Sequence, residues 1–194
     1  MSLSVDELKK TVASLKREGL NSQQIADELS LSQDTIAWLS SSIEGQEQPQ
    51  DIRIGWRTIG VRPIRTEAMA SIFADVLHEE LGDDGADTIV GISLNGILFA
   101  HEIAKFLDVE VSIHRNVDGG PGQGSLSNKY GQVNGKRVAI VDDVLSSGTT
   151  MRRTIAAMRE MGADVVLCMV LVNKTTLNEI DEVPLRGMIR TVAV

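Results

Sequence analysis

The N-terminal part of the chain carries apolar side chains at a spacing of three to four residues, which predicts helices and no strands. Leu8, Val12 and Leu15 define a first helix that Gly19 ends. Ser22 is the predicted N-cap of a second helix and Ser32 that of a third. Residues 1–44 are therefore expected to form a small all-α domain. Its inward-facing positions on the second and third helices are Ile25, Ala26, Leu29, Ile36 and Leu39, with Trp38 as a further candidate.

The pattern changes after residues 45–50, which hold no large apolar side chain and are typical of a linker. An amphipathic helix is predicted over 66–81, and short apolar runs then alternate with helical stretches. Strands separated by helices, with apolar residues on both faces, predict a parallel α/β sheet flanked by helices over residues 51–194. The predicted strands are 88–92, 109–114, 137–142, 165–172 and 188–194, and the predicted helices between them are 97–107 and 149–161.

Composition narrows the class of protein. The chain has 194 residues, of which 42% are hydrophobic and 3% aromatic, so aliphatic side chains must fill its core. The formal net charge of −8 argues against wholesale coating of nucleic acid or anionic lipid, but it permits a local DNA site. Cys168 is the one cysteine, and it lies in an apolar run typical of a buried thiol. With no membrane-length apolar run and no signal peptide, we expect a cytoplasmic protein without a membrane partner.

The segment from Val138 to Thr150 carries the clearest chemistry. An apolar run ends in two carboxylates, which can accept hydrogen bonds from ribose hydroxyls or reach Mg²⁺ through water. A turn rich in hydroxyl groups then starts a helix, where free amides bind phosphate. The simpler alternative is a strand followed by a capped helix. The residues concerned are Asp142, Asp143, Ser146, Ser147, Gly148, Thr149 and Thr150.

This pattern resembles the phosphoribosyl-pyrophosphate motif of the type I phosphoribosyltransferases. A second segment, Val90–Ala100, is similar to the pyrophosphate loop of that family. The resemblance implies a type I phosphoribosyltransferase-like sheet, backbone contacts to pyrophosphate around Leu94, Asn95 and Gly96, and Mg²⁺ brought in with phosphoribosyl pyrophosphate. Within that family the chain resembles the orotate phosphoribosyltransferase-like proteins.

The chain departs from the orotate enzymes at two places. Their mobile lid carries an Arg-Lys pair, whereas Arg115 has no lysine neighbour and the next basic residue is Lys129. Loss of cations aimed at a transition state costs several kcal/mol of barrier. The enzymes' Asp-Arg pair is replaced by Asn173-Lys174, and Lys174 can cover a base, contact a phosphate or remain a solvated loop lysine. The catalytic role is thus unassigned, with Asp143, Arg115 and Lys129 as candidates.

Residues 20–39 resemble a helix-turn-helix motif. In that arrangement Ser22 and Ser32 lie near DNA phosphates, and Gln33 and Thr35 face base edges. Residues 1–50 hold four basic and eight acidic groups, and the predicted recognition helix has no lysine or arginine. The alternative is a three-helix dimerisation or docking module.

Three functions remain open on the sequence. The one we favour is a homodimeric transcriptional regulator whose phosphoribosyltransferase-like domain senses phosphoribosyl pyrophosphate or a related ribose phosphate. This plan resembles archaeal regulators of sugar catabolism. The alternative is an active phosphoribosyltransferase that transfers phosphoribose to a nucleobase and releases pyrophosphate. The third is a catalytically silent interaction module.

Overall fold

The computed structural model describes residues 4–41, 51–116, 124–127 and 129–191. The chain divides into two compact units, one that ends at Gly55 and a second over Trp56–Thr191. The second unit therefore begins at Trp56, a few residues after the expected start at Asp51. The predicted linker, 45–50, lies outside the described residues.

The first unit is helical, with α1 (Val5–Arg17), α2 (Ser22–Leu29) and α3 (Gln33–Ser40) packed around one apolar cluster. All five predicted inward-facing residues are buried, together with Val12 and Leu31. The predicted cap at Ser22 is wrong, because Asn21 caps α2. Its side chain accepts from the Gln24 amide, and the Gln24 side chain accepts from the Asn21 amide, so the two satisfy each other.

A three-residue turn joins α2 to α3. Ser30 ends α2 in a left-handed conformation with φ +52°. Ser32 is the N-cap of α3, as predicted, and its Oγ accepts from the Thr35 amide at 3.1 Å. Two helices joined by so short a turn are the arrangement of a helix-turn-helix.

The second unit is built on a sheet with the strand order β3-β2-β1-β4-β5-β7-β6. Pairing is parallel from β2 through β7, and only the short outer strands β3 and β6 pair antiparallel. The parallel α/β sheet expected from the sequence is thus confirmed. The strands are β1 (Thr88–Ile92), β2 (Glu110–Asn116), β3 (Gly124–Leu126), β4 (Arg137–Leu145), β5 (Asp164–Asn173), β6 (Glu179–Ile180) and β7 (Val183–Arg190).

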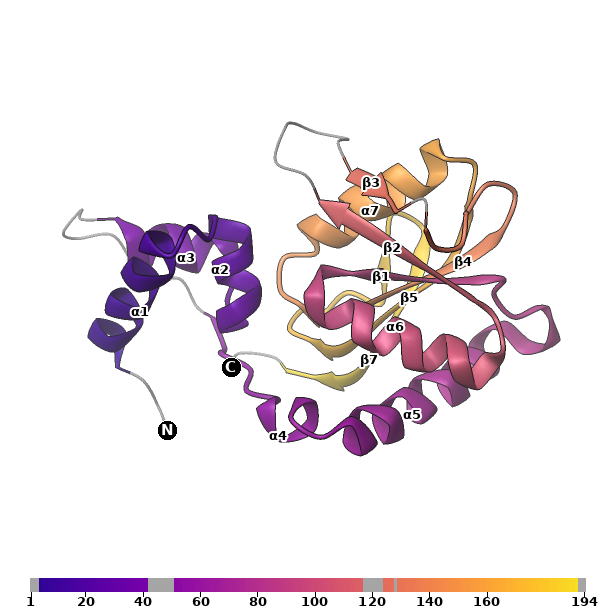
Figure 1. Ribbon diagram of the computed structural model, residues 1–194, viewed down its shortest axis with the longest axis horizontal. Helices are drawn as coiled ribbons and strands as arrows, with labels where there is room; N and C mark the ends of the chain where they lie inside the picture. Colours follow the sequence, from indigo (N-terminus) through magenta and orange to yellow (C-terminus); the bar gives the residue numbers. More distant parts are fainter. Residues whose placement is uncertain (1–3, 42–50, 117–123, 128, 192–194) are drawn as a thin grey trace. The chain divides into compact units, whose positions relative to one another are not determined.

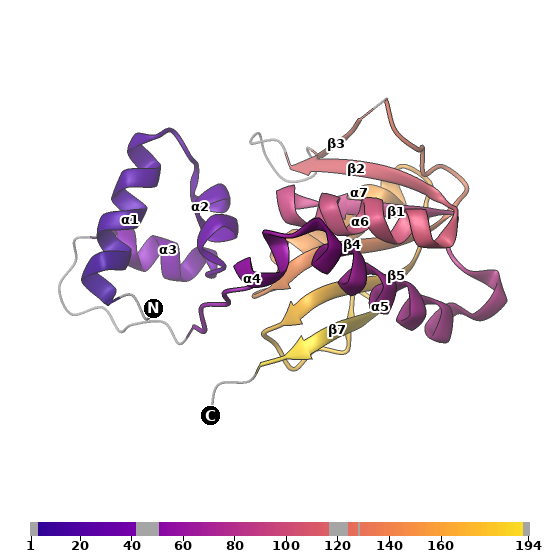
Figure 2. The same ribbon diagram turned by 60° about the horizontal axis from the view of Figure 1, so that its bottom comes forward.

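Helices cover both faces of this sheet (Figures 1 and 2). On one face, α6 (Ser93–Leu107) lies over β1 and β4 and packs against α5 (Pro63–Leu81). On the other, α7 (Thr149–Glu160) buries Met151, Ile155 and Met158 in the main apolar cluster. Cys168 lies in that cluster, fully buried as predicted, and burial raises the pKa of its thiol to about 12.

Several element boundaries differ from the prediction. Strand β4 continues to Leu145, so Asp142 and Asp143 lie within the strand rather than at its predicted end. Strand β7 spans Val183–Arg190 instead of 188–194. Both α5 and α6 begin earlier than expected. The elements that the sequence did not predict are α4 (Arg57–Gly60), the 3-10 helix η1 (Gly82–Asp84), β3 and β6.

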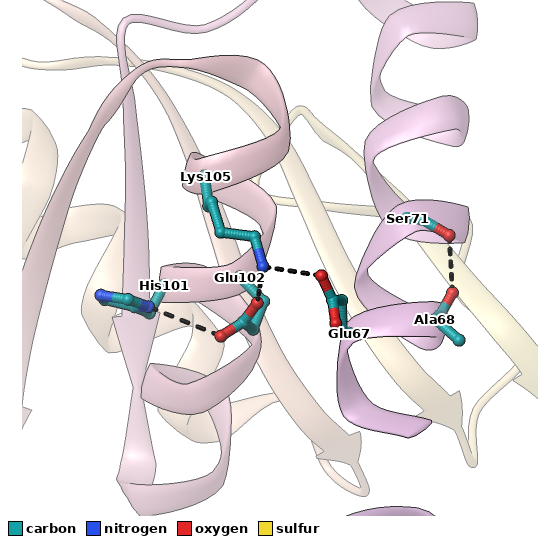
Figure 3. A network of polar contacts seen from close by, with 6 residues as sticks. All are labelled: Glu67, Ala68, Ser71, His101, Glu102 and Lys105. Carbon is teal, nitrogen blue, oxygen red and sulfur yellow. Dashed lines mark hydrogen bonds and ion pairs between the residues drawn. The ribbon is translucent and has the colours of Figure 1, made fainter. Parts of the chain in front are cut away.

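A polar network ties α5 to α6 on their outer surface (Figure 3). The ammonium group of Lys105 donates to Glu67 of α5 and to Glu102 of its own helix, each at 2.8 Å. The three side chains are 28–50% exposed, so solvent weakens the ion pairs and the bridge orients two helices more than it stabilises them. No helix in the described part of the chain combines the length and apolar character needed to cross a membrane.

Candidate functional site

The predicted ligand-binding residues gather where the adjacent strands β1 and β4 run toward their carboxyl ends. Pairing of the two strands stops at Gly91 and Val141, and beyond it the first turn of α6 lies against β4. A Cβ at Gly96 would lie 2.6 Å from the Val141 carbonyl oxygen and 3.0 Å from the Asp142 Cα. Only glycine permits this approach, which brings the start of α6 to the two carboxylates.

Asp142 is anchored to the first residue of α6. Its Oδ1 accepts from the Ser93 hydroxyl at 2.6 Å and from the Asp143 amide at 2.9 Å. The same Ser93 hydroxyl accepts from the Gly96 amide at 3.2 Å. Ser93 has φ +60°, a left-handed conformation that costs a non-glycine residue energy and is common at ligand sites. Asp142 is 8% exposed.

Asp143 is buried beneath two side-chain donors. Its Oδ2 accepts from the side-chain amide of Asn95 and from the indole nitrogen of Trp56, both at 2.9 Å. Burial raises the pKa of this carboxyl, and the hydrogen bonds from Trp56, Asp142 and Asn95 partly offset that rise. The donors to Asp143 are side chains, so hydroxyl groups of a ligand could take their place on this carboxylate.

Trp56 is a donor to Asp143 that the sequence did not reveal. It lies at the N-cap of α4, and its ring packs against Phe99 of α6 with the centroids 5.6 Å apart. The residue stands 87 positions before Asp143, so no periodicity or local motif links the two. Ser93 was also missed, although it begins the loop in which Leu94, Asn95 and Gly96 were predicted.

The hydroxyl-rich turn follows β4 and leads into α7. Gly148 has φ +77° and is the N-cap of α7, and its carbonyl accepts from the Arg152 amide. Ser147 and Thr149 are exposed, with their hydroxyl oxygens 3.0 Å apart. Ser146 and Thr150 are partly buried. The helix after this turn has no acidic residue in its first turn, so its N-terminus favours an anion.

The start of α6 supplies a second helix N-terminus of the same kind. It too has no acidic residue in its first turn. Leu94 is 84% exposed, whereas Asn95 is partly buried and Gly96 buried. The structure therefore brings Leu94, Asn95 and Gly96 to the same strand ends as Asp142, Asp143 and the 146–150 turn.

The structure describes the side chains of two of the three basic residues predicted for the site. The backbone of Arg115 lies in β2, paired with Ser125, while its side chain lies outside the described part. Lys129 is exposed in a turn, and Lys174 is partly buried just after β5. Asn173 is fully buried: its Oδ1 accepts from the amide and hydroxyl of Thr175, and its Nδ2 donates to the Leu177 carbonyl. Asn173 thus shapes the turn after β5.

His114 lies on β2 beside Ile92, on the face of the sheet that α7 covers. It is 2% exposed, and its Nδ1 is 3.4 Å from the Thr154 hydroxyl. Burial lowers the pKa of the imidazole. Its Nε2 has no hydrogen-bond partner within the described residues, which favours the neutral ring.

In the first unit the predicted DNA-contacting residues fall into two pairs. Ser22 and Gln33 are exposed, and Gln33 donates to the Gln23 side chain of α2. Ser32 is partly buried and Thr35 is 7% exposed, and both are bound to Asp51. Their roles toward DNA stay predictions.

Comparison with known proteins agrees with this geometry. Residues 56–188 match the model of the phosphoribosyl transferase domain. The transcriptional regulator GfcR of Thermoplasma acidophilum is 38% identical over 191 residues, covering 97% of this chain and 96% of that protein. The GfcR of Picrophilus torridus is 34% identical over 194 residues, covering 98% of this chain and 99% of that protein.

Solved structures show the same fold at low sequence identity. Adenine phosphoribosyltransferase from Thermoanaerobacter pseudethanolicus superposes with a TM-score of 0.59 at 19% identity, covering 75% of this chain and 91% of that one. Orotate phosphoribosyltransferase from Aeropyrum pernix superposes with a TM-score of 0.54 at 22% identity, covering 76% of this chain and 83% of that one. The chain therefore belongs to the phosphoribosyl transferase domain family and, over nearly its whole length, to the archaeal transcriptional regulators named GfcR.

Proposed function

We propose that this transcriptional regulator binds DNA through α2 and α3 and senses phosphoribosyl pyrophosphate, or a related ribose phosphate, at the ends of β1 and β4. The observation that carries the proposal is the convergence of two buried carboxylates with two helix N-termini. Asp142 and Asp143 suit ribose hydroxyls. The starts of α6 and α7 suit the pyrophosphate and the 5′-phosphate.

We further propose that Mg²⁺ enters with phosphoribosyl pyrophosphate. The ion would be held mainly by the phosphates of the ligand and by water, and Asp142 and Asp143 are the hard oxygen donors nearest to where it would lie. No group of three metal-binding side chains occurs among the residues that the structure describes. Mg²⁺ would screen the charge of the pyrophosphate beside the two carboxylates.

Sensing is favoured over catalysis by two observations. The curated relatives are named transcriptional regulators. In addition, the side chain of Asn173 is occupied by the turn after β5, and Lys174 cannot give a planar, two-pronged grip on a carboxylate. The alternative, an active phosphoribosyltransferase with Asp143, Arg115 or Lys129 in its chemistry, is supported by the fold alone.

The output would be a change in how a homodimer presents two helix-turn-helix units to DNA. Two-fold symmetry places the half-sites about one helical turn apart. Ser22 and Ser32 would lie near phosphates, with Gln33 and Thr35 at base edges. Because α3 has no lysine or arginine, we expect weak affinity for each half-site and dependence on the dimer.

Calorimetric titration of the full chain with phosphoribosyl pyrophosphate and Mg²⁺ tests the ligand. The double variant Asp142→Asn, Asp143→Asn should lose binding, whereas Asp75→Asn, which removes an exposed carboxylate of α5, should keep it. Pyrophosphate release is assayed in parallel with a panel of nucleobases. Turnover above about 1 s⁻¹ would overturn the regulator proposal in favour of the enzyme.

A further inference from the structure

The carboxylate of Asp51 lies at the N-terminus of α3. Its Oδ2 accepts from the Ser32 amide at 2.7 Å and from the Thr35 hydroxyl at 2.8 Å. Close by in the chain, the guanidinium of Arg53 donates to the Leu29 carbonyl, near the end of α2, at 3.3 Å. The segment that follows the first unit's helices thus folds back onto the turn between α2 and α3.

This contact uses two groups that DNA would need, Ser32 toward a phosphate and Thr35 toward a base edge. Ser32 and Thr35 are two of the predicted DNA-contacting residues, and both are bound to the same carboxylate oxygen. The amides at a helix start are a natural anion site, and here the anion comes from the chain itself. A carboxylate at this position also repels a phosphate backbone. The contact therefore opposes DNA binding.

The same segment leads directly to the proposed ligand site. Trp56 follows Asp51 by five residues, and its indole donates to Asp143. Five residue steps of extended chain span at most about 18 Å, so displacement of Trp56 pulls on a short tether. A ribose hydroxyl that donates to Asp143 Oδ2 competes with the indole for that oxygen. Ligand binding and release of Trp56 are thus linked.

We propose that residues 51–56 form a ligand-operated latch, in which Asp51 blocks the start of α3 until a ribose phosphate displaces Trp56 from Asp143. The latch deepens the proposed function and rests on it. In the ligand-free chain both hydrogen-bonded ends hold, and DNA affinity is low. When the ligand takes Asp143, Trp56 and then Asp51 are released, and Ser32 and Thr35 become available to DNA.

Fluorescence anisotropy of a labelled, random-sequence DNA duplex at low salt tests the output, because the blocked contact is to phosphate and needs no operator. Wild type should bind about fivefold or more tightly when phosphoribosyl pyrophosphate and Mg²⁺ are added, within the usual range of coupling between sites. Asp51→Ala removes the acceptor and should bind tightly without ligand and respond little to it. Asp51→Asn removes the charge but keeps an oxygen that can accept from Ser32 and Thr35, so its ligand-free affinity should lie between those of Asp51→Ala and wild type. Asp34→Asn, in the first turn of the same helix, removes an equal charge and should keep the full ligand response.

Trp56→Phe tests the other end of the latch. The phenyl ring can still pack on Phe99, but the donor to Asp143 is lost. This variant should bind DNA tightly without ligand while still binding phosphoribosyl pyrophosphate. In a Trp38→Phe background, Trp56 is the sole tryptophan, and its emission should shift as phosphoribosyl pyrophosphate is added.

The outcomes separate the latch from the function on which it rests. If wild type with ligand binds DNA, but the Asp51 and Trp56 variants keep the wild-type ligand response, the latch is wrong and the function stands. An unchanged Trp56 emission at saturating ligand also overturns the latch. If neither wild type with ligand nor Asp51→Ala binds DNA, the DNA-binding function itself fails. Circular dichroism melts confirm that each variant is folded.

Discussion

The hydroxyl of Ser93 donates a 2.6 Å hydrogen bond to Asp142 Oδ1, and Ser93 reaches it from a left-handed backbone with φ +60°. This pair joins the end of β1 to β4 at the point where direct strand pairing has stopped. The hydrogen bond therefore offsets the cost of the left-handed backbone at Ser93. Both the hydrogen bond and the left-handed backbone require the start of α6 to be packed against β4.

Replacing Ser93 separates these two contributions. Ser93→Ala keeps the strained φ and removes one of the two hydrogen bonds that the Asp142 carboxylate oxygen accepts, so we expect a loss of about 1–3 kcal/mol in the free energy of unfolding. Ser93→Gly loses the same donor but relieves a strain of about 1–2 kcal/mol, so its loss should be smaller. Urea denaturation of the two variants measures the difference. Equal losses would show that the left-handed backbone carries no cost here.

Gly96→Ala should damage both stability and ligand binding. The added methyl group would meet backbone atoms of Val141 and Asp142, which cannot move aside as a side chain can. We expect a loss of about 1–3 kcal/mol in the free energy of unfolding, because the start of α6 must shift away from β4. The same shift should weaken the proposed binding of phosphoribosyl pyrophosphate. Glu79→Ala, at an exposed position of α5, is the control. Thermal melts and calorimetry check both effects.

Asp143→Asn should stabilise the protein while abolishing its ligand response. Burial raises the pKa of Asp143, so holding the ionised form costs folding free energy at neutral pH. An asparagine oxygen can still accept from Trp56 and Asn95 without that cost. We expect the free energy of unfolding to rise by about 0.5–2 kcal/mol, and Tm to rise by roughly 2–4 °C for each kcal/mol, which a thermal melt measures.

The pH dependence of this gain gives a further check on Asp143. In the unfolded chain the carboxyl titrates near its ordinary pKa of 3.8, and in the folded chain at higher pH. The wild type therefore loses stability as pH rises through this interval. The advantage of Asp143→Asn should be full at neutral pH and vanish below the ordinary pKa. An advantage that persists in acid would point to a packing effect instead.

His114 should make the fold sensitive to mild acid. Burial lowers its pKa in the folded protein below the ordinary 6.5, so the unfolded chain binds a proton first as pH falls. Stability is therefore complete above pH 6.5 and declines below it, until the folded-state pKa is reached. His114→Gln should remove this part of the decline, whereas His101→Gln, whose side chain is 68% exposed, should not. Denaturation at a series of pH values measures both slopes.

The parts of the structure that could be predicted from the sequence are those that depend on neighbours in the chain. The Ser32 cap and the strand over Thr88–Ile92 follow from local residue pattern, and both are confirmed. The carboxylates Asp142 and Asp143 could be predicted as candidates because one continuous segment contains them. Their grouping with Leu94, Asn95 and Gly96 followed from the family resemblance, and adjacency of β1 and β4 explains it.

The missed features depend on contacts across the fold. Strand β7 begins at Val183 although Pro184, Arg186 and Gly187 interrupt its apolar pattern, because pairing with β5 and β6 supplies its partners. Helix α6 starts at Ser93, through Ser-Leu-Asn-Gly residues typical of a turn, because β4 supports its first turn. Trp56 meets Asp143 only once α4 and β4 are both in place, so no stretch of sequence records that contact.

The strand order also has a consequence for how the molecule is made. Residues of α1, α2 and α3 find their partners within a short stretch of chain, whereas Thr88 of β1 is paired with Val138 of β4, fifty residues further along. Local contacts form faster than distant ones, and synthesis delivers them first. We expect pulsed hydrogen exchange during refolding to protect α1–α3 before β1 and β4. During translation, the helical first unit would then be complete while the sheet of the second unit is still being synthesised.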